Sequence, residues 1–225
     1  MQLLILGGSG RTGRLIVEEA LSKGHNVVAL VRSASSFPLG ARPGLTLVEG
    51  TPMKPEDLQK AFAASPNSPD AVLVALSLKR LSDSPFAAVD PSNPIRIMED
   101  SVANAVAVMK EHETKRLVIM SQWGAGDSFG SMNFLFRGMF SHTNMKYGLA
   151  AHNNLDKETR STGVDYTLVR ASILADGDVA PIKLYPDDGK GINFLPKVTR
   201  ASVAKFMVEA CEKDDFIGRS PVISN

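Results

Sequence analysis

The sequence predicts an α/β protein built on a doubly wound parallel sheet in a single domain, residues 1–225. Short apolar runs alternate with segments of helical periodicity, a pattern typical of parallel strands covered by helices on both faces. A glycine-spaced turn joins the first apolar run directly to the first helical segment. The length of 225 residues suffices for one buried core and lies near the upper end for one domain.

Six apolar runs are predicted to be strands because each is short, rich in Val, Ile and Leu, and separated from the next by turn or helical sequence. They are Leu3–Leu6, Val27–Val31, Leu45–Val48, Ala71–Leu76, Arg116–Met120 and Tyr166–Val169. A further short strand is expected near Pro221–Ile223.

The helices are predicted from apolar residues at helical spacing and from capping residues: Gly24 ends the first, Pro55 begins the second and Gly163 ends the fourth. They are Arg11–Lys23, Pro55–Ala64, Pro94–Glu113, about Met145–Ser161 and about Ala201–Lys213. Two stretches lack clean periodicity, 79–93 and 124–144. Both follow the carboxyl end of a strand, where open α/β sheets bind ligands, so we expect them to face the substrate.

The turn after the first strand reads Gly7-Gly8-Ser9-Gly10-Arg11-Thr12-Gly13. A Rossmann-type sheet presents a helix N-terminus to the phosphates of a dinucleotide with such a turn. Gly7 permits the tight turn, Gly10 lets the backbone approach a pyrophosphate, and Gly13 lets the helix pack closely. We therefore expect a cofactor site made of Gly7, Ser9, Gly10, Arg11, Thr12 and Gly13. A glycine-rich turn without a ligand is the alternative.

The second strand ends Val31-Arg32-Ser33, with no acidic residue to hold a ribose 2′-hydroxyl. Arg32 can bind a 2′-phosphate through its guanidinium, and Ser33 or Ser36 can donate a hydroxyl. Arg11 adds a second positive charge on the same side. The sequence therefore favours NADP(H) over NAD as cofactor, with a merely solvated Arg32 as the alternative.

Composition excludes several classes of protein. The formal net charge is +1 and no run of Lys or Arg occurs, so we expect neither a nucleic-acid nor an anionic-membrane surface. Cys211 is the only cysteine, which excludes an internal disulfide, and no His, Asp, Glu or Cys spacing indicates a metal site. The first strand follows Met1 almost at once and no apolar run approaches the roughly 20 residues of a membrane span, so we expect a cytoplasmic protein.

These landmarks occur together with Glu49-Gly50, Lys115-Arg116-Leu117-Val118-Ile119-Met120-Ser121, the run from Ser161 to Arg170, and Val198-Thr199-Arg200-Ala201-Ser202-Val203-Ala204. In this order they resemble the atypical short-chain dehydrogenases/reductases, specifically the NmrA-like and biliverdin reductase B/flavin reductase group, over nearly the whole chain. The resemblance implies that Ser121, Gln122 and Trp123 face the nicotinamide. We also expect Leu76, Ser77 and Arg170 to bind the cofactor.

The chain departs from the group's pattern at three places. Gly50-Thr51 stands where relatives have Gly-Asp, and Arg170-Ala171 where they have Arg-Pro. The Tyr-x-x-x-Lys pair that supplies the proton in typical members is missing, because Ala151 follows four residues after Tyr147.

The resemblance implies that His152 stands in place of that Lys. Asp156 lies one helical turn later on the same face, where a carboxylate would raise the imidazole pKa and suit a proton donor near neutral pH. We therefore predict His152 and Ser121 as catalytic residues. A structural His152–Asp156 pair and a plain strand-end serine are the alternatives.

The 124–144 segment is unusually apolar for a connection, and it is a candidate substrate lid, a core helix or a dimer face. Its apolar residues are Phe129, Met132, Phe134, Leu135, Phe136, Met139 and Phe140. As a lid it would suit an aromatic substrate, with Phe134 and Phe136 in contact and Trp123 as a stacking surface.

These observations predict an NADPH-dependent oxidoreductase that reduces a small aromatic or conjugated substrate such as a carbonyl, quinone or flavin. Two alternatives stay open: an NADP-binding sensor without turnover, and a non-redox cyclase or isomerase on the same fold. The expected partner is a small-molecule substrate, and the chain is expected to be a monomer or homodimer.

Overall fold

A computed structural model describes residues 1–225, which are organised around one eight-stranded sheet with the order β3-β2-β1-β4-β5-β6-β10-β8. The strands are β1 (Gln2–Leu6), β2 (Asn26–Val31), β3 (Leu45–Glu49), β4 (Ala71–Val74), β5 (Arg116–Gln122), β6 (Asp165–Ala171), β8 (Lys183–Tyr185) and β10 (Val222–Ser224). Neighbouring strands run parallel except β10 and β8, which are antiparallel. The predicted doubly wound Rossmann-like sheet is confirmed.

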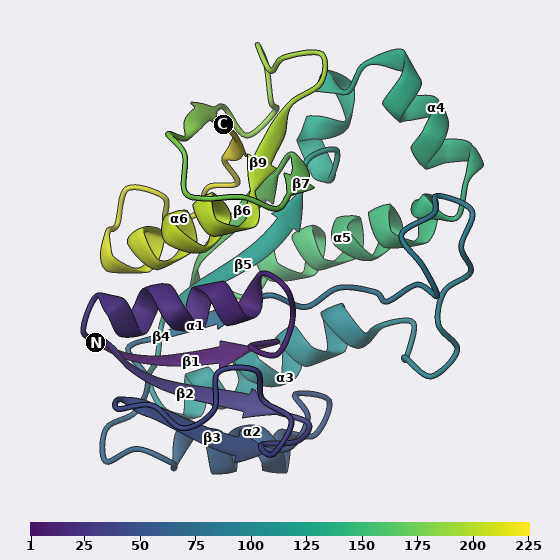
Figure 1. The fold of residues 1–225 in the computed structure, drawn as a ribbon. Coiled ribbons are helices and arrows are strands. Elements are labelled where there is room, and N and C mark those ends of the chain that lie inside the picture. The colour runs from purple at the N-terminus through teal and green to yellow at the C-terminus, as the bar shows by residue number, and fades with distance from the viewer.

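Helices cover both faces of the sheet, as Figure 1 shows. They are α1 (Gly13–Ser22), α2 (Pro55–Phe62), α3 (Ile97–Glu111), α4 (Phe134–His142), α5 (Met145–Arg160) and α6 (Arg200–Glu212), together with the 3-10 helix η1 (Gly126–Ser131). The buried residues of α1 and α6 form one core with the sheet, and those of α2, α3 and α5 form another on the opposite face. No helix has the length and apolarity to cross a membrane.

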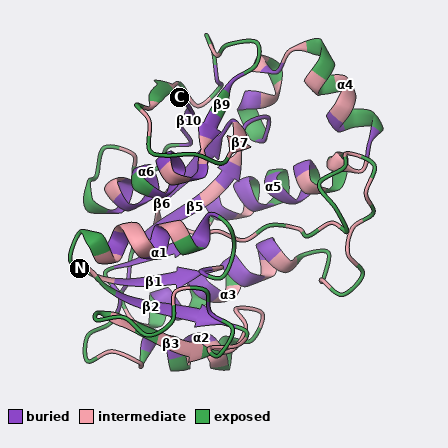
Figure 2. Cartoon of the chain, in the orientation of Figure 1, coloured by how far each residue is buried: buried purple, intermediate pink, exposed green.

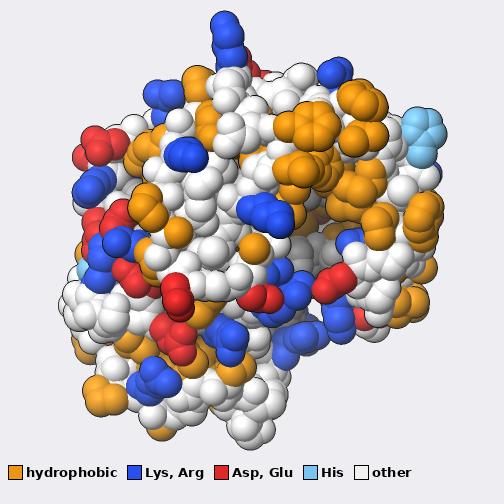
Figure 3. Space-filling view, turned by 45° about the horizontal axis from the view of Figure 1, so that its top comes forward, with side chains coloured by type: hydrophobic (Ala, Val, Ile, Leu, Met, Phe, Trp, Pro, Cys, Tyr) orange, Lys and Arg blue, Asp and Glu red, His pale blue; other side chains and the backbone are white.

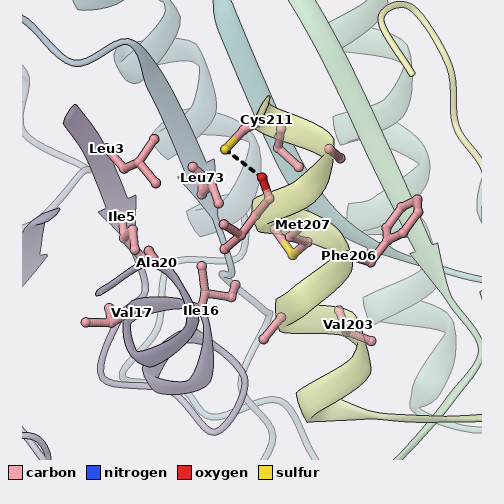
Figure 4. Packing of buried hydrophobic residues seen from close by; sticks show 14 of the residues in the cluster. Leu3, Ile5, Ile16, Val17, Ala20, Leu73, Val203, Phe206, Met207 and Cys211 are labelled. Carbon is pink, nitrogen blue, oxygen red and sulfur yellow. Dashed lines mark hydrogen bonds between the residues drawn. The ribbon is translucent and has the colours of Figure 1, made fainter. Parts of the chain in front are cut away.

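The packing of α1 and α6 fixes where the glycine turn lies. Figure 4 shows Ile16 of α1 and Met207 of α6 in one buried cluster with Leu3 and Ile5 of β1. Burying each such side chain contributes about 1.5 to 3 kcal/mol. Cys211, near the end of α6, belongs to the same core, and its Sγ donates a hydrogen bond to the backbone carbonyl of Val208 at 3.0 Å. The start of α1 is thereby held at the carboxyl end of β1.

Several short elements were not predicted: η1, β8, and the parallel pair β7 (Ile173–Ala175) and β9 (Lys197–Thr199), which forms a small second sheet. A helix within 124–144, now α4, was one of three alternatives for that segment. The predicted strand 71–76 ends at Val74, and the predicted helix 94–113 begins at Ile97. Figure 2 shows that the central strands are buried, whereas α4 carries exposed residues. Of these elements, α4 and β7 contribute residues to the walls of the site described next, whereas β8 pairs with β10 at the edge of the main sheet.

Candidate functional site

The glycine turn has the geometry of an anion cradle. Gly7 has φ +86°, and a Cβ there would lie 2.5 Å from the carbonyl oxygen of Ala75, just after β4. A Cβ on Gly13 would overlap the carbonyl oxygen of Gly7, so α1 can begin this close only with glycine. Gly10 is exposed, and the backbone N–H groups of Arg11, Thr12 and Gly13 have no acceptor in the protein. Free N–H groups at the positive end of a helix fit a phosphate.

The end of β2 holds both a cation and a carboxylate. Arg32 is exposed and forms none of the protein's ion pairs. Ser33 lies beside it, with its Oγ 3.0 Å from the Oγ of Ser35. Glu49, at the end of β3, accepts a hydrogen bond from the backbone N–H of Ala34 at 2.7 Å. This acid was missed from the sequence because it comes from the neighbouring strand, although Glu49-Gly50 was noted as a landmark.

A cavity of about 740 Å³ extends from the glycine turn along the carboxyl ends of β5 and β6. Both stretches that lack periodicity contribute to its walls. The polar wall contains Gly10, Arg11, Ser77, Lys79, Arg80, Ser82 and Asp83. The apolar wall contains Trp123, Met132, Phe136, Met139, Phe140, Met145, Ile173 and Leu174. Figure 3 shows this hollow with Lys and Arg side chains and hydrophobic side chains around it.

The polar wall is drawn toward the glycine turn by one ion pair. Nη2 of Arg11 lies 3.4 Å from Oδ1 of Asp83, and both side chains are largely exposed. Arg80 is half-buried and donates to the backbone carbonyl of Ser84. Leu76 is half-buried, and its Cδ2 would lie 3.2 Å from a Cβ on Gly7. The polar wall thus carries three cations, Arg11, Lys79 and Arg80, and one carboxylate, Asp83.

Ser121 and His152 meet at the floor of the cavity. Ser121 Oγ lies 3.4 Å from His152 Nδ1, and both residues are buried. Burial lowers the pKa of His152 from 6.5 to about 4. The imidazole is therefore neutral near pH 7, which is opposite to the direction expected from the sequence.

Asp156 does not pair with His152, so that prediction is wrong. Its Oδ2 accepts from Arg170 at 2.6 Å, and its Oδ1 accepts from Arg160 at 2.5 Å. The physical reason is the guanidinium of Arg170, which is 0% exposed and requires a buried counter-charge. Arg170 also donates to the backbone carbonyl of Asp187.

The prediction that Arg170 binds the cofactor is wrong for the same reason. Its side chain is fully buried, and both terminal nitrogens donate to the protein itself. It holds β6, α5 and the loop at Asp187 together beneath the cavity.

Two polar side chains at the cavity have atoms without a partner. Gln122 Nε2 and Ser172 Oγ are shielded from solvent and form no hydrogen bond within the protein. A buried polar atom without a partner costs about 1 to 3 kcal/mol, so such atoms are typical of ligand sites. Gln122 was predicted from the sequence and Ser172 was not. The only feature of the sequence that could have indicated Ser172 is its position directly after β6.

The apolar segment 124–144 forms η1 and α4. Phe136 lines the cavity and packs edge-on against Trp123, with ring centroids 5.5 Å apart. Trp123 Nε1 donates to Ser131 Oγ at 2.8 Å, which fixes the indole in the wall. Phe134 is not a lining residue and is 72% exposed, so the expectation that both phenylalanines contact substrate is wrong for Phe134. No group of three or more metal-ligating side chains lies together.

A family model and a curated relative match this chain. Residues 7–214 match the family model described as NAD(P)H-binding. The photosystem II assembly factor Ycf39 of Synechocystis is 24% identical over 232 residues, covering 100% of this chain and 63% of that protein. The chain therefore spans less than two thirds of this relative's length.

Two solved structures share the fold over 100% of the chain. A short-chain dehydrogenase/reductase from Veillonella parvula, in complex with NADP, has a TM-score of 0.77 at 17% identity and is covered over 94% of its length. ChuY, an anaerobilin reductase from Escherichia coli, has a TM-score of 0.76 at 16% identity and is covered over 97%.

Proposed function

The chain belongs to the NAD(P)H-binding family, and from that membership we propose that it is an oxidoreductase that uses NADPH to reduce a small aromatic or conjugated substrate. One observation carries the proposal. A single cavity joins the phosphate cradle at Gly10 to an apolar aromatic wall at Trp123 and Phe136, with Ser121 and His152 between them. Such a cavity can hold a nicotinamide and an apolar ring side by side.

The chain's own residues would hold the cofactor at three places. The N–H groups of Arg11, Thr12 and Gly13 would bind the pyrophosphate, and Arg32 with Ser33 would bind the 2′-phosphate. Gln122 and Ser172 have the free hydrogen-bonding capacity that a carboxamide needs. Bound NADPH supplies the hydride.

In this proposal Ser121 polarises a substrate oxygen. Its hydroxyl can donate to that oxygen while the neutral imidazole of His152 holds it in position. Because the imidazole carries no extra proton near pH 7, the proton that completes the reduction comes from water. The apolar wall limits the access of other water to the site.

The test is NADPH oxidation by the full chain with quinones, flavins and aromatic carbonyls. Oxidation that depends on one of these acceptors supports the proposal. Tight NADPH binding with no turnover across the panel indicates a sensor instead, which the exposed Tyr147 outside the cavity and Ala151 in the following turn favour. Product formed without NADPH oxidation indicates a cyclase or isomerase.

Arg32→Ala tests the cofactor preference. The variant is expected to bind NADPH about 10- to 150-fold more weakly, because a hydrogen bond to a charged group contributes about 1.5 to 3 kcal/mol, and to bind NADH almost unchanged. Both affinities are measured by titration calorimetry. Glu49→Gln is the matched control at the same strand ends. Equal losses for NADPH and NADH would show that Arg32 does not bind the 2′-phosphate.

The buried His152 is expected to make stability depend on pH. Its pKa is about 4 when folded and about 6.5 when unfolded, so the unfolded chain binds the proton first. Stability is then lost as pH falls from about 6.5 to about 4, by about 3 kcal/mol. Urea unfolding at several pH values should show this loss in the wild type, and His152→Gln should lack it. A turnover limb near pH 6.5 that disappears in His152→Gln would contradict a neutral imidazole.

A further inference from the structure

Four large apolar side chains form an exposed patch beside the cavity. Phe134 and Leu135 begin α4 and are 72% and 57% exposed, and Phe194 and Leu195 precede β9 and are 54% and 62% exposed. Asn133 joins the two segments, because its Nδ2 donates to the backbone carbonyl of Phe194 at 2.7 Å. Figure 1 shows the start of α4 and the loop before β9 at the same end of the molecule. We call these four residues the α4 patch.

The patch is contiguous with the mouth of the cavity. Phe136, Met139 and Phe140 of the same helix line the cavity, whereas Phe134 and Leu135 do not. In Figure 3, hydrophobic side chains gather beside the hollow on this face. Single exposed apolar residues are ordinary, but a contiguous group at the rim of a binding site marks an interaction surface.

Within the two segments that carry the patch the charged side chains are all cations, and the nearest carboxylates in sequence, Asp187 and Asp188, lie just before the second segment. Segments 133–147 and 189–197 contain no Asp or Glu and carry the cations Arg137, Lys146, Lys190 and Lys197. All four are exposed, and none has an ion-pair partner. The surface that complements such a patch is apolar just below a layer of negative charge.

We propose that the α4 patch docks on a lipid surface with anionic headgroups. Its phenylalanine and leucine side chains enter the boundary of the acyl chains, and the surrounding cations meet the headgroups. A second copy of this chain fits less well, because a two-fold contact through the patch would bring like charges together. This proposal departs from the expectation of no anionic-membrane surface, which rested on the absence of a run of Lys or Arg; the cations of the patch lie apart in the chain, at 137–146 and 190–197. Docking would place the cavity mouth at the membrane, where an apolar substrate could enter it directly.

Co-sedimentation of the full chain with vesicles tests the proposal. We expect binding to vesicles of phosphatidylcholine with phosphatidylserine, little binding to phosphatidylcholine alone, and release by high salt. The double variant Phe134→Ser/Leu135→Ser is expected to bind about tenfold more weakly or worse, since it removes the inserted apolar area. Arg137→Ala is expected to bind about fivefold more weakly, the effect of one cation near an anionic surface. Ile217→Ser, an exposed apolar residue in the turn after α6, is the matched control and should bind normally.

Three results would overturn the proposal. The first is no binding of the wild type to the anionic vesicles, and the second is binding that the patch variants leave unchanged. The third is a dimer, seen by analytical ultracentrifugation, that Phe134→Ser/Leu135→Ser dissociates while vesicle binding is absent; this would assign the patch to a contact between copies. No substrate or cofactor enters the assay, so a negative result leaves the proposed reductase activity standing.

Discussion

Gly10→Val is expected to abolish dinucleotide binding while the protein still folds. Gly10 is exposed at the cavity, and a Cβ there would meet only the carbonyl oxygen of Gly7, at 3.3 Å. The branched side chain would instead occupy the space above the free N–H groups of Arg11 and Thr12. Losing two such donors to a charged phosphate, each worth about 1.5 to 3 kcal/mol, weakens binding about 100-fold or more. Titration calorimetry with NADPH measures the loss, and circular dichroism checks the fold.

Two other glycines provide the controls. Gly130→Val, also in open space but outside the cavity, should keep NADPH affinity. Gly13→Val should instead prevent folding, because its Cβ would overlap the backbone of the turn. If the Gly10→Val variant folds and still binds NADPH normally, the glycine turn is not part of the cofactor site.

The central sheet could be predicted because its signals are local. Runs such as Val27–Val31 are buried on both faces and read as continuous apolar sequence, and Gly24 and Gly163 have the positive φ that ends a helix. The missed strands β7, β8 and β9 are three residues long and depend on partners far along the chain. The apolar residues of α4 left a helix as only one of three alternatives, because one face lines a cavity and another is exposed.

In the site, too, the features that are contiguous in sequence could be predicted, and those that depend on residues from other elements could not. The glycine turn is contiguous in sequence, and its close approach to Ala75 and to the start of α1 matches the expected spacing. Helical spacing correctly put His152 and Asp156 on one face of α5 but could not reveal that Arg170, on β6, competes for the carboxylate. A buried guanidinium outweighs a neutral imidazole as a partner, since an unpaired buried charge costs far more than an unpaired neutral group.

That competition leads to the largest expected effect on stability. Asp156→Ala should lower the free energy of unfolding by about 3 to 5 kcal/mol, because it leaves the fully buried Arg170 without its counter-charge. The loss should loosen the contacts among β6, α5 and the Asp187 loop, and with them the floor of the cavity. Urea unfolding of wild type and variant, followed through Trp123, the single tryptophan, measures the difference.

Asp100→Ala is the matched control, because Asp100 also pairs with an arginine one helical turn away, Arg96, but both side chains are about half exposed. Its cost should stay below about 1 kcal/mol. Removing both buried charges, as in Asp156→Leu/Arg170→Met, should recover much of the stability lost in Asp156→Ala, since the isolated charge rather than the missing contact causes the loss. If the double variant is instead the less stable of the two, packing around Arg170 dominates. A cost for Asp156→Ala no larger than for Asp100→Ala would mean that water reaches Arg170 and that the ion pair does not support the cavity floor.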